Sequence, residues 1–101
     1  MVSFGQSDDE LKKALSKYKI EWDDNFKMEG QGRFVMTPDN GSLLRLWNYP
    51  ESCEEYGTLA HEIFHAVDFI LRRVGITLSD DSHEAYAYLI GYLTKEIYKR
   101  I

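Results

Sequence analysis

The sequence has little of three features that would each assign it to a class of protein. It contains one cysteine, Cys53, among 101 residues, so no disulfide can form within the chain. Its longest apolar run is well short of the ~18 residues that a membrane-spanning helix needs. Acidic residues outnumber basic ones by 17 to 12, which gives a net charge of −5. We therefore expect neither a membrane protein nor a protein whose main partner is nucleic acid.

The low cysteine content also indicates a cellular location. A lone thiol, together with the absence of a signal peptide, predicts a reducing, cytoplasmic setting. Cys53 is interpreted as a small residue at the start of a helix. It is a weak candidate nucleophile, because the histidines that would activate it are better explained as metal ligands.

The composition is that of an ordinary globular domain. Hydrophobic residues make up 44% of the chain and charged residues 29%, a balance that separates it from disordered sequences. At this length a chain buries enough surface to fold alone. We predict a single domain over residues 1–101.

The first half of the chain predicts a helix and a small sheet. Ser7-Asp8-Asp9-Glu10 has the capping-box pattern and starts an amphipathic helix over residues 8–19. Residues 33–37 and 42–48 are β-prone and flank Pro38-Asp39-Asn40-Gly41. Because Asn-Gly suits a tight hairpin turn, the two segments are predicted to form an antiparallel sheet.

Two long helices are predicted to follow. A second capping box, Ser52-Cys53-Glu54-Glu55, allows a helix to begin near residue 53, and Gly75 ends it. The last helix begins after Asp80-Asp81-Ser82 and carries apolar residues at helical spacing as far as Ile97. A short loop containing glycine joins the helices, so they should lie antiparallel as a helical hairpin. The predicted fold class is therefore α+β.

The first of these helices carries a His-Glu-x-x-His run. His61 and His65 are four residues apart and so point the same way on a helix. Two imidazoles on one face can bind one zinc ion, while Glu62 activates a water on that metal. The competing interpretation is two polar residues and a surface acid on a semi-exposed helix face.

A catalytic zinc site usually has three protein ligands, so a third donor is needed. Glu84 is within reach, because about 8 helical residues after His65 span roughly 12 Å, which the following loop can recover. Glu84 can instead close a capping box with Asp81. His83 would point about 100° away from Glu84. It is interpreted as a residue of the surface or cleft rim that can stabilise an oxyanion.

Two further residues have competing interpretations. Tyr88 lies one turn after Glu84, where its hydroxyl can support a ligand or the transition state, or its ring can fill the space between helices. Asp68 lies three residues after His65. It can accept a hydrogen bond from a ligand imidazole or pair with Arg72 on the surface.

The His-Glu-x-x-His run and the position of Glu84 resemble the gluzincin metallopeptidases, such as thermolysin-like proteases and aminopeptidases. In that family a Glu on the following helix completes the zinc site, and here eighteen residues separate His65 from Glu84. The run from Ser82 to Tyr88 is similar to the Asn-Glu-Gly-Phe-Ala run around that Glu in aminopeptidases.

A closer resemblance is to small zincin-like proteins encoded by phages and bacterial mobile elements. It is carried by Leu59-Ala60-His61-Glu62-Ile63-Phe64-His65-Ala66-Val67, by Gly75-Ile76 and by Glu84-Ala85-Tyr86-Ala87-Tyr88-Leu89. It covers roughly residues 42–94. The resemblance implies a minimal zincin-like domain from a phage in a bacterial host cell, with a two-helix hairpin carrying the metal site.

Carried over by position, the resemblance implies His61, His65 and Glu84 as zinc ligands and Glu62 as the general base. The implied activity is zinc-dependent hydrolysis of peptide bonds in a peptide or protein substrate. Residues 42–48 are the predicted strand for pairing with an extended substrate. The sequence makes no prediction of the oligomeric state.

Two other functions are consistent with the sequence. A non-catalytic binding protein can keep a structural metal site as a staple, closed by a fourth ligand such as His83 or Cys53. An acidic phage-borne protein can also bind a host factor without metal, in which case the two histidines of the motif are coincidental.

Overall fold

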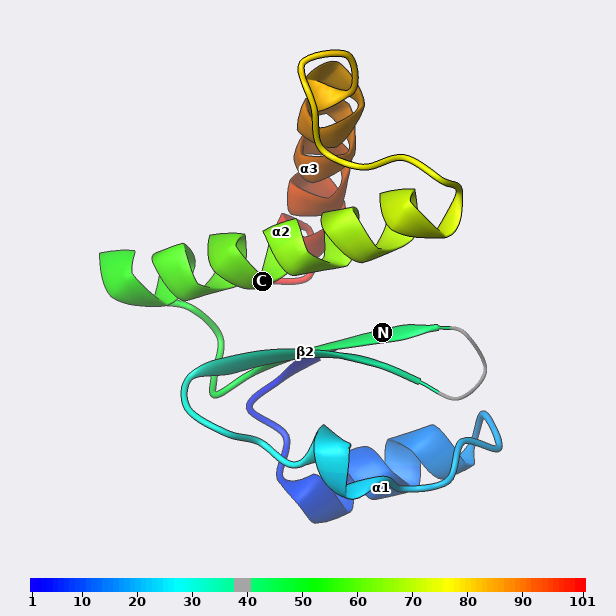
Figure 1. The fold of residues 1–101 in the computed structure, drawn as a ribbon. Helices are drawn as coiled ribbons and strands as arrows, with labels where there is room; N and C mark the ends of the chain where they lie inside the picture. The colour runs from blue at the N-terminus through cyan, green and yellow to red at the C-terminus, as the bar shows by residue number, and fades with distance from the viewer. Residues whose placement is uncertain (38–40) are drawn as a thin grey trace.

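The computed structural model describes residues 1–37 and 41–101. Its elements, in chain order, are β1 (Val2–Phe4), α1 (Asp8–Ser16), the 3-10 helix η1 (Asp24–Phe26), β2 (Gly32–Met36), β3 (Ser42–Leu46), α2 (Cys53–Arg73) and α3 (His83–Tyr98). The N-terminal helix, the three-stranded sheet and the two C-terminal helices form a compact α+β fold, as predicted (Figure 1).

The sheet has the strand order β1-β3-β2. β2 and β3 pair antiparallel, which confirms the hairpin predicted between residues 33–37 and 42–48. Residues 38–40, which belong to the predicted turn, lie outside the described residues. β1, which no sequence pattern indicated, pairs parallel with the other edge of β3. β3 is thus the central strand, and β2 is an edge strand.

Helices cover both faces of the sheet, with α2 and α3 on one side and α1 on the other (Figure 1). One hydrophobic core consists of Leu44, Leu46, Leu59, Ile63, Val67, Tyr86 and Ile97. A second consists of Leu11, Leu15, Phe26 and Leu43. Because side chains alternate along a strand, the neighbours Leu43 and Leu44 of β3 belong to different cores.

Arg45 crosses from β3 into the layer of α1 and is only 1% exposed. Its Nη1 donates to Oδ1 of Asp8 at 2.6 Å and to the carbonyl of Phe26 at 2.7 Å, and its Nη2 donates to the carbonyl of Gln6 at 2.8 Å. The hydrogen bond from Arg45 holds the pKa of the Asp8 carboxyl below its usual value. Arg45 therefore fixes the start of α1 and the end of η1 against the sheet.

α1 begins where it was predicted to begin but is shorter. The Ser7 hydroxyl accepts from the Glu10 N–H at 3.1 Å, and the Glu10 carboxylate accepts from the Ser7 N–H at 3.2 Å. The helix ends at Ser16 and not at residue 19 as predicted. Lys19 has a φ of 60°, in the left-handed region where a right-handed helix cannot continue.

α2 begins at the second predicted capping box. The Ser52 hydroxyl accepts from the Glu55 N–H at 3.1 Å, and the Glu55 carboxylate accepts from the Ser52 N–H at 3.3 Å. The helix ends at Arg73, and Gly75 follows with a φ of 83°. This left-handed position explains why a glycine stands after the helix.

α3 packs against α2 in the antiparallel sense. Near its first turn, the ring of Tyr86 lies 6.2 Å from that of Phe64, and at its end the ring of Tyr98 lies 5.7 Å from that of Tyr56. The contacts therefore run in opposite order along the two helices, but the helices do not lie alongside each other as in the predicted antiparallel hairpin. Figure 1 shows that α3 is steeply inclined to α2 and that its first turn lies farthest from it.

None of the helices within residues 1–37 and 41–101 combines the length and the apolar character that crossing a membrane requires.

Candidate metal centre

The His-Glu-x-x-His run lies in the middle of α2, and both histidines are exposed. The Nε2 atoms of His61 and His65 are 3.1 Å apart. Two Zn–N bonds of the usual length at a tetrahedral angle place their nitrogens about 3.3 Å apart. The two imidazoles therefore have the spacing of two ligands on one ion. With suitable tautomers, the same distance also allows one imidazole to donate a hydrogen bond to the other.

Glu62 lies beside this pair on the side of α2 that faces β2. Although it carries a carboxylate, it is only 7% exposed. It makes no hydrogen bond or ion pair with any residue of the described chain. Among the described residues, the buried side-chain atoms without a hydrogen-bond partner are Nε of Arg33 and Nε of Arg45, so the carboxylate oxygens of Glu62 reach solvent.

A glycine in β2 allows this close approach of helix and strand. A Cβ added at Gly32 would lie 2.8 Å from Cγ2 of Thr58, 3.1 Å from Cδ2 of Leu46 and 3.2 Å from Cγ of Glu62. Real Cβ atoms essentially never lie as close as the first of these distances. With any larger residue at this position, the neighbouring side chains or α2 itself would have to shift at the level of Glu62.

Glu84 is not brought to the histidine pair. It lies in the first turn of α3, is exposed, and precedes the buried Tyr86 by two residues. Two helical residues turn the side chain by about 200°, so Glu84 lies on the side of α3 opposite to the one that packs on α2. In the described part of the chain, no group of three His, Cys, Asp or Glu side chains could hold a metal ion. The two histidines thus fit a zinc ion, whereas the predicted third ligand does not join them in this arrangement.

The competing interpretation of Glu84, a capping box with Asp81, is not observed either. The N-cap residue of α3 is Ser82, and its side chain makes no capping hydrogen bond. The Ser82 hydroxyl instead accepts from the Ser79 N–H at 2.9 Å and donates to the Thr77 carbonyl at 2.5 Å. These bonds close the loop that precedes α3.

Asp68 lies on α2 next to the histidines and connects the two helices. Its carboxylate accepts from the Tyr86 hydroxyl at 2.8 Å and from Nε of Arg72 at 2.8 Å. These two hydrogen bonds, the one from Tyr86 first, hold the pKa of Asp68 below its ordinary value. Burial, reinforced by the bond to Asp68, raises the pKa of the Tyr86 hydroxyl. The predicted pair with Arg72 is therefore present, and Tyr86 is a second partner of Asp68 that no sequence pattern indicated.

The remaining candidates, Tyr88, His83 and Cys53, are exposed residues of α2 and α3. Tyr88 is 77% exposed and shares the outward face of α3 with Glu84. His83 is the first residue of α3 and is exposed. Cys53 is the first residue of α2, exposed and without a disulfide.

A cleft that the sequence did not indicate lies toward the start of α2. It has a volume of about 440 Å³ and is lined by Gly30, Gln31, Leu46, Trp47, Asn48, Ser52, Glu54, Glu55 and Thr58. We call it the Trp47 cleft. Thr58 faces β2 one turn before Glu62, so the cleft begins beside the His-Glu-x-x-His run.

No family model, curated protein or solved structure matches the chain.

Proposed function

We propose that this protein is a zinc-dependent hydrolase of peptide bonds and that His61 and His65 bind the metal. The proposal is carried by one observation, the pair of imidazole nitrogens 3.1 Å apart next to a largely buried glutamate whose carboxylate oxygens reach solvent. Bound zinc would supply a Lewis acid and a lowered pKa for a water molecule. The exposed position of the pair favours this function over a structural metal site, because structural sites are closed by four ligands.

Glu62 has the role of general base in this proposal. Its position beside the His pair and against β2 allows it to take a proton from a water between α2 and the strand and to deliver it to the leaving amine. The packing of Glu62 against Gly32 holds the side chain in one place, which proton transfer to a fixed substrate requires.

β2 is the strand we propose for pairing with an extended substrate. The prediction of residues 42–48 for this role is wrong, because β3 already pairs with β1 on one edge and with β2 on the other. β2 has a second edge that no strand of the described chain occupies. A peptide added there would run past the His-Glu-x-x-His face of α2, and its main chain would be held by β-sheet hydrogen bonds.

Glu84 remains the proposed third ligand, and this part of the proposal requires a different position of α3. Its first turn would have to rotate about the helix axis and move toward α2 before the carboxylate could face His61 and His65. Metal content tests this directly. Zinc per chain in gently purified protein should fall strongly in Glu84→Ala and stay unchanged in the matched control Asp81→Ala. Equal zinc in all three proteins would exclude Glu84 as a ligand.

The catalytic proposal is tested by Glu62→Gln, which keeps the size of the side chain. We expect this variant to retain zinc, measured by elemental analysis, and to lose hydrolysis of a pool of synthetic peptides followed by mass spectrometry. Glu51→Gln, at an exposed position before α2, is the control. Peptide hydrolysis that survives undiminished in Glu62→Gln would refute the mechanism, and wild-type protein without zinc would refute the metal site.

A further inference from the structure

The Trp47 cleft has no role in the chemistry described above, although it adjoins it. It lies between the segment that enters β2, the end of β3 and the first two turns of α2. Thr58 lines its inner end and contacts Gln31, with the two side-chain oxygens 3.4 Å apart. Thr58 and His61 are less than one helical turn apart. A peptide on the free edge of β2 that passes the histidine pair would therefore continue into the cleft.

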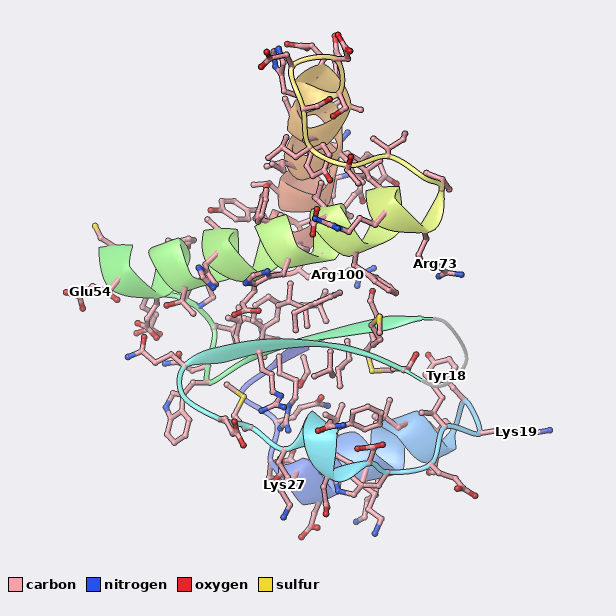
Figure 2. The ribbon with its side chains drawn as sticks, in the orientation of Figure 1. Tyr18, Lys19, Lys27, Glu54, Arg73 and Arg100 are labelled. Carbon is pink, nitrogen blue, oxygen red and sulfur yellow. The ribbon has the colours of Figure 1, made fainter. Side chains whose placement is uncertain are left out.

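The walls of this cleft combine an aromatic ring with negative charge. Trp47 is 67% exposed, which is unusual for so large an apolar side chain. Glu54 also lines the cleft, and its carboxylate makes no hydrogen bond or ion pair with another described residue. Figure 2 shows Glu54 and Arg73 at opposite ends of α2, so the basic residues in the last turn are remote from the cleft.

The start of α2 accounts for part of the cleft's chemistry, because Glu54 and Glu55 lie in its first turn and complement the positive end of the helix dipole. The Ser52 hydroxyl and the Glu55 carboxylate both serve the capping box. This leaves Glu54 as the carboxylate available to a ligand and Trp47 as the available ring. A carboxylate and an indole face together suit an elongated cation with an apolar stem, since the ring attracts the charge and covers the methylene groups.

We propose that the Trp47 cleft is a specificity subsite that takes a lysine or arginine side chain of the peptide substrate. This inference rests on the proposed hydrolytic function, because it takes a peptide on the edge of β2 as the ligand. Glu54 lies seven residues before His61, about 10 Å along the helix axis. A long basic side chain extending from a residue close to the scissile bond spans that separation.

Binding of two matched peptides tests the subsite separately from hydrolysis. Both peptides are acetylated and amidated, so that no terminal charge contributes, and they differ only in one lysine replaced by the uncharged norleucine. Affinity is measured with Glu62→Gln protein by calorimetry and by tryptophan fluorescence, to which Trp22 and Trp47 both contribute. We expect the lysine peptide to bind about three- to tenfold more tightly. The preference should disappear in Glu62→Gln/Glu54→Gln and persist in the control Glu62→Gln/Glu51→Gln.

The outcomes separate this inference from the proposed function. Equal binding of the two peptides, or a lysine preference that survives Glu54→Gln, overturns the subsite even if wild-type protein hydrolyses both peptides. A lysine preference that depends on Glu54, in a protein that holds no zinc and cleaves neither peptide, overturns the hydrolase and leaves the cationic subsite standing. Salt should weaken the preference, because the interacting charges are exposed.

Discussion

The contact between β2 and α2 at Gly32 can be tested by adding one methyl group. In Gly32→Ala the new Cβ would lie 2.8 Å from Cγ2 of Thr58, whereas carbon atoms normally pack about 3.5 to 4.0 Å apart. Helix and strand must therefore separate by up to about 1 Å. Overpacking of this kind costs about 1 to 3 kcal/mol. The reduced entropy of the unfolded chain offsets about 0.4 to 1 kcal/mol, because Gly32 does not have the positive φ that would strain an alanine.

The net loss should be about 1 to 2 kcal/mol, which lowers the Tm of a domain of this size by roughly 5 to 15 °C. Thermal and urea unfolding followed by circular dichroism measure it. Under the proposed function hydrolysis should fall by up to about a hundredfold, because Glu62 moves with the helix.

Thr58→Ser supplies the matched second variant, since it removes the methyl group and keeps the hydroxyl. In the double variant Gly32→Ala/Thr58→Ser, much of the lost stability should return, with a coupling of about 1 kcal/mol. If Gly32→Ala unfolds at or above the wild-type temperature, or if Thr58→Ser restores nothing, the helix and the strand do not meet at this point.

Three further predictions concern the elements that support the site. Arg45→Met should destabilise the protein by about 3 kcal/mol, since it leaves the buried carbonyl of Phe26 and the half-buried carbonyl of Gln6 unpaired, and urea unfolding would show a smaller effect if the guanidinium is dispensable. The pKa of Asp68 is lowered in the folded state, so its contribution to stability is present above the unfolded pKa of about 4 and is lost as the pH falls through the folded pKa. Asp68→Asn should therefore flatten the acid limb of a curve of stability against pH. An unchanged acid limb would contradict this. Ser52→Ala should cost about 1 kcal/mol by removing the cap of α2, and an unchanged Tm would show that the cap contributes nothing.

The sequence predicted those elements whose signals are local. The capping boxes of α1 and α2 marked the starts of both helices, and the Asn-Gly pair marked the hairpin of β2 and β3. β1 has only three residues, which are too few for a periodic pattern, and it pairs with a strand some forty residues away. Without β1, the sequence could not show that β3 is central, and residues 42–48 were predicted as a strand with a free edge although both edges of β3 are paired.

The candidate site was predictable within one helix and not between two. His61, Glu62 and His65 follow from helical spacing alone, and the observed pair has the expected geometry. Whether Glu84 faces the histidines depends on the rotation of α3 about its axis. The number of residues between His65 and Glu84 does not determine that rotation. The buried stripe through Tyr86 and Ile97 sets that rotation. Reading this stripe in the sequence would have placed Glu84 on the outward face.

The division of the core by the sheet has a consequence for how the molecule opens. Among the described residues, the buried side chains under α1 and those under α2 form two separate clusters on opposite faces of the sheet, so the two layers can act as separate cooperative units in hydrogen exchange. Amides of α1 should then exchange by opening of their own layer, while those of α2 remain protected. Such opening would detach the N-terminal helix and leave the two imidazoles in register, because both are carried by the same uninterrupted helix.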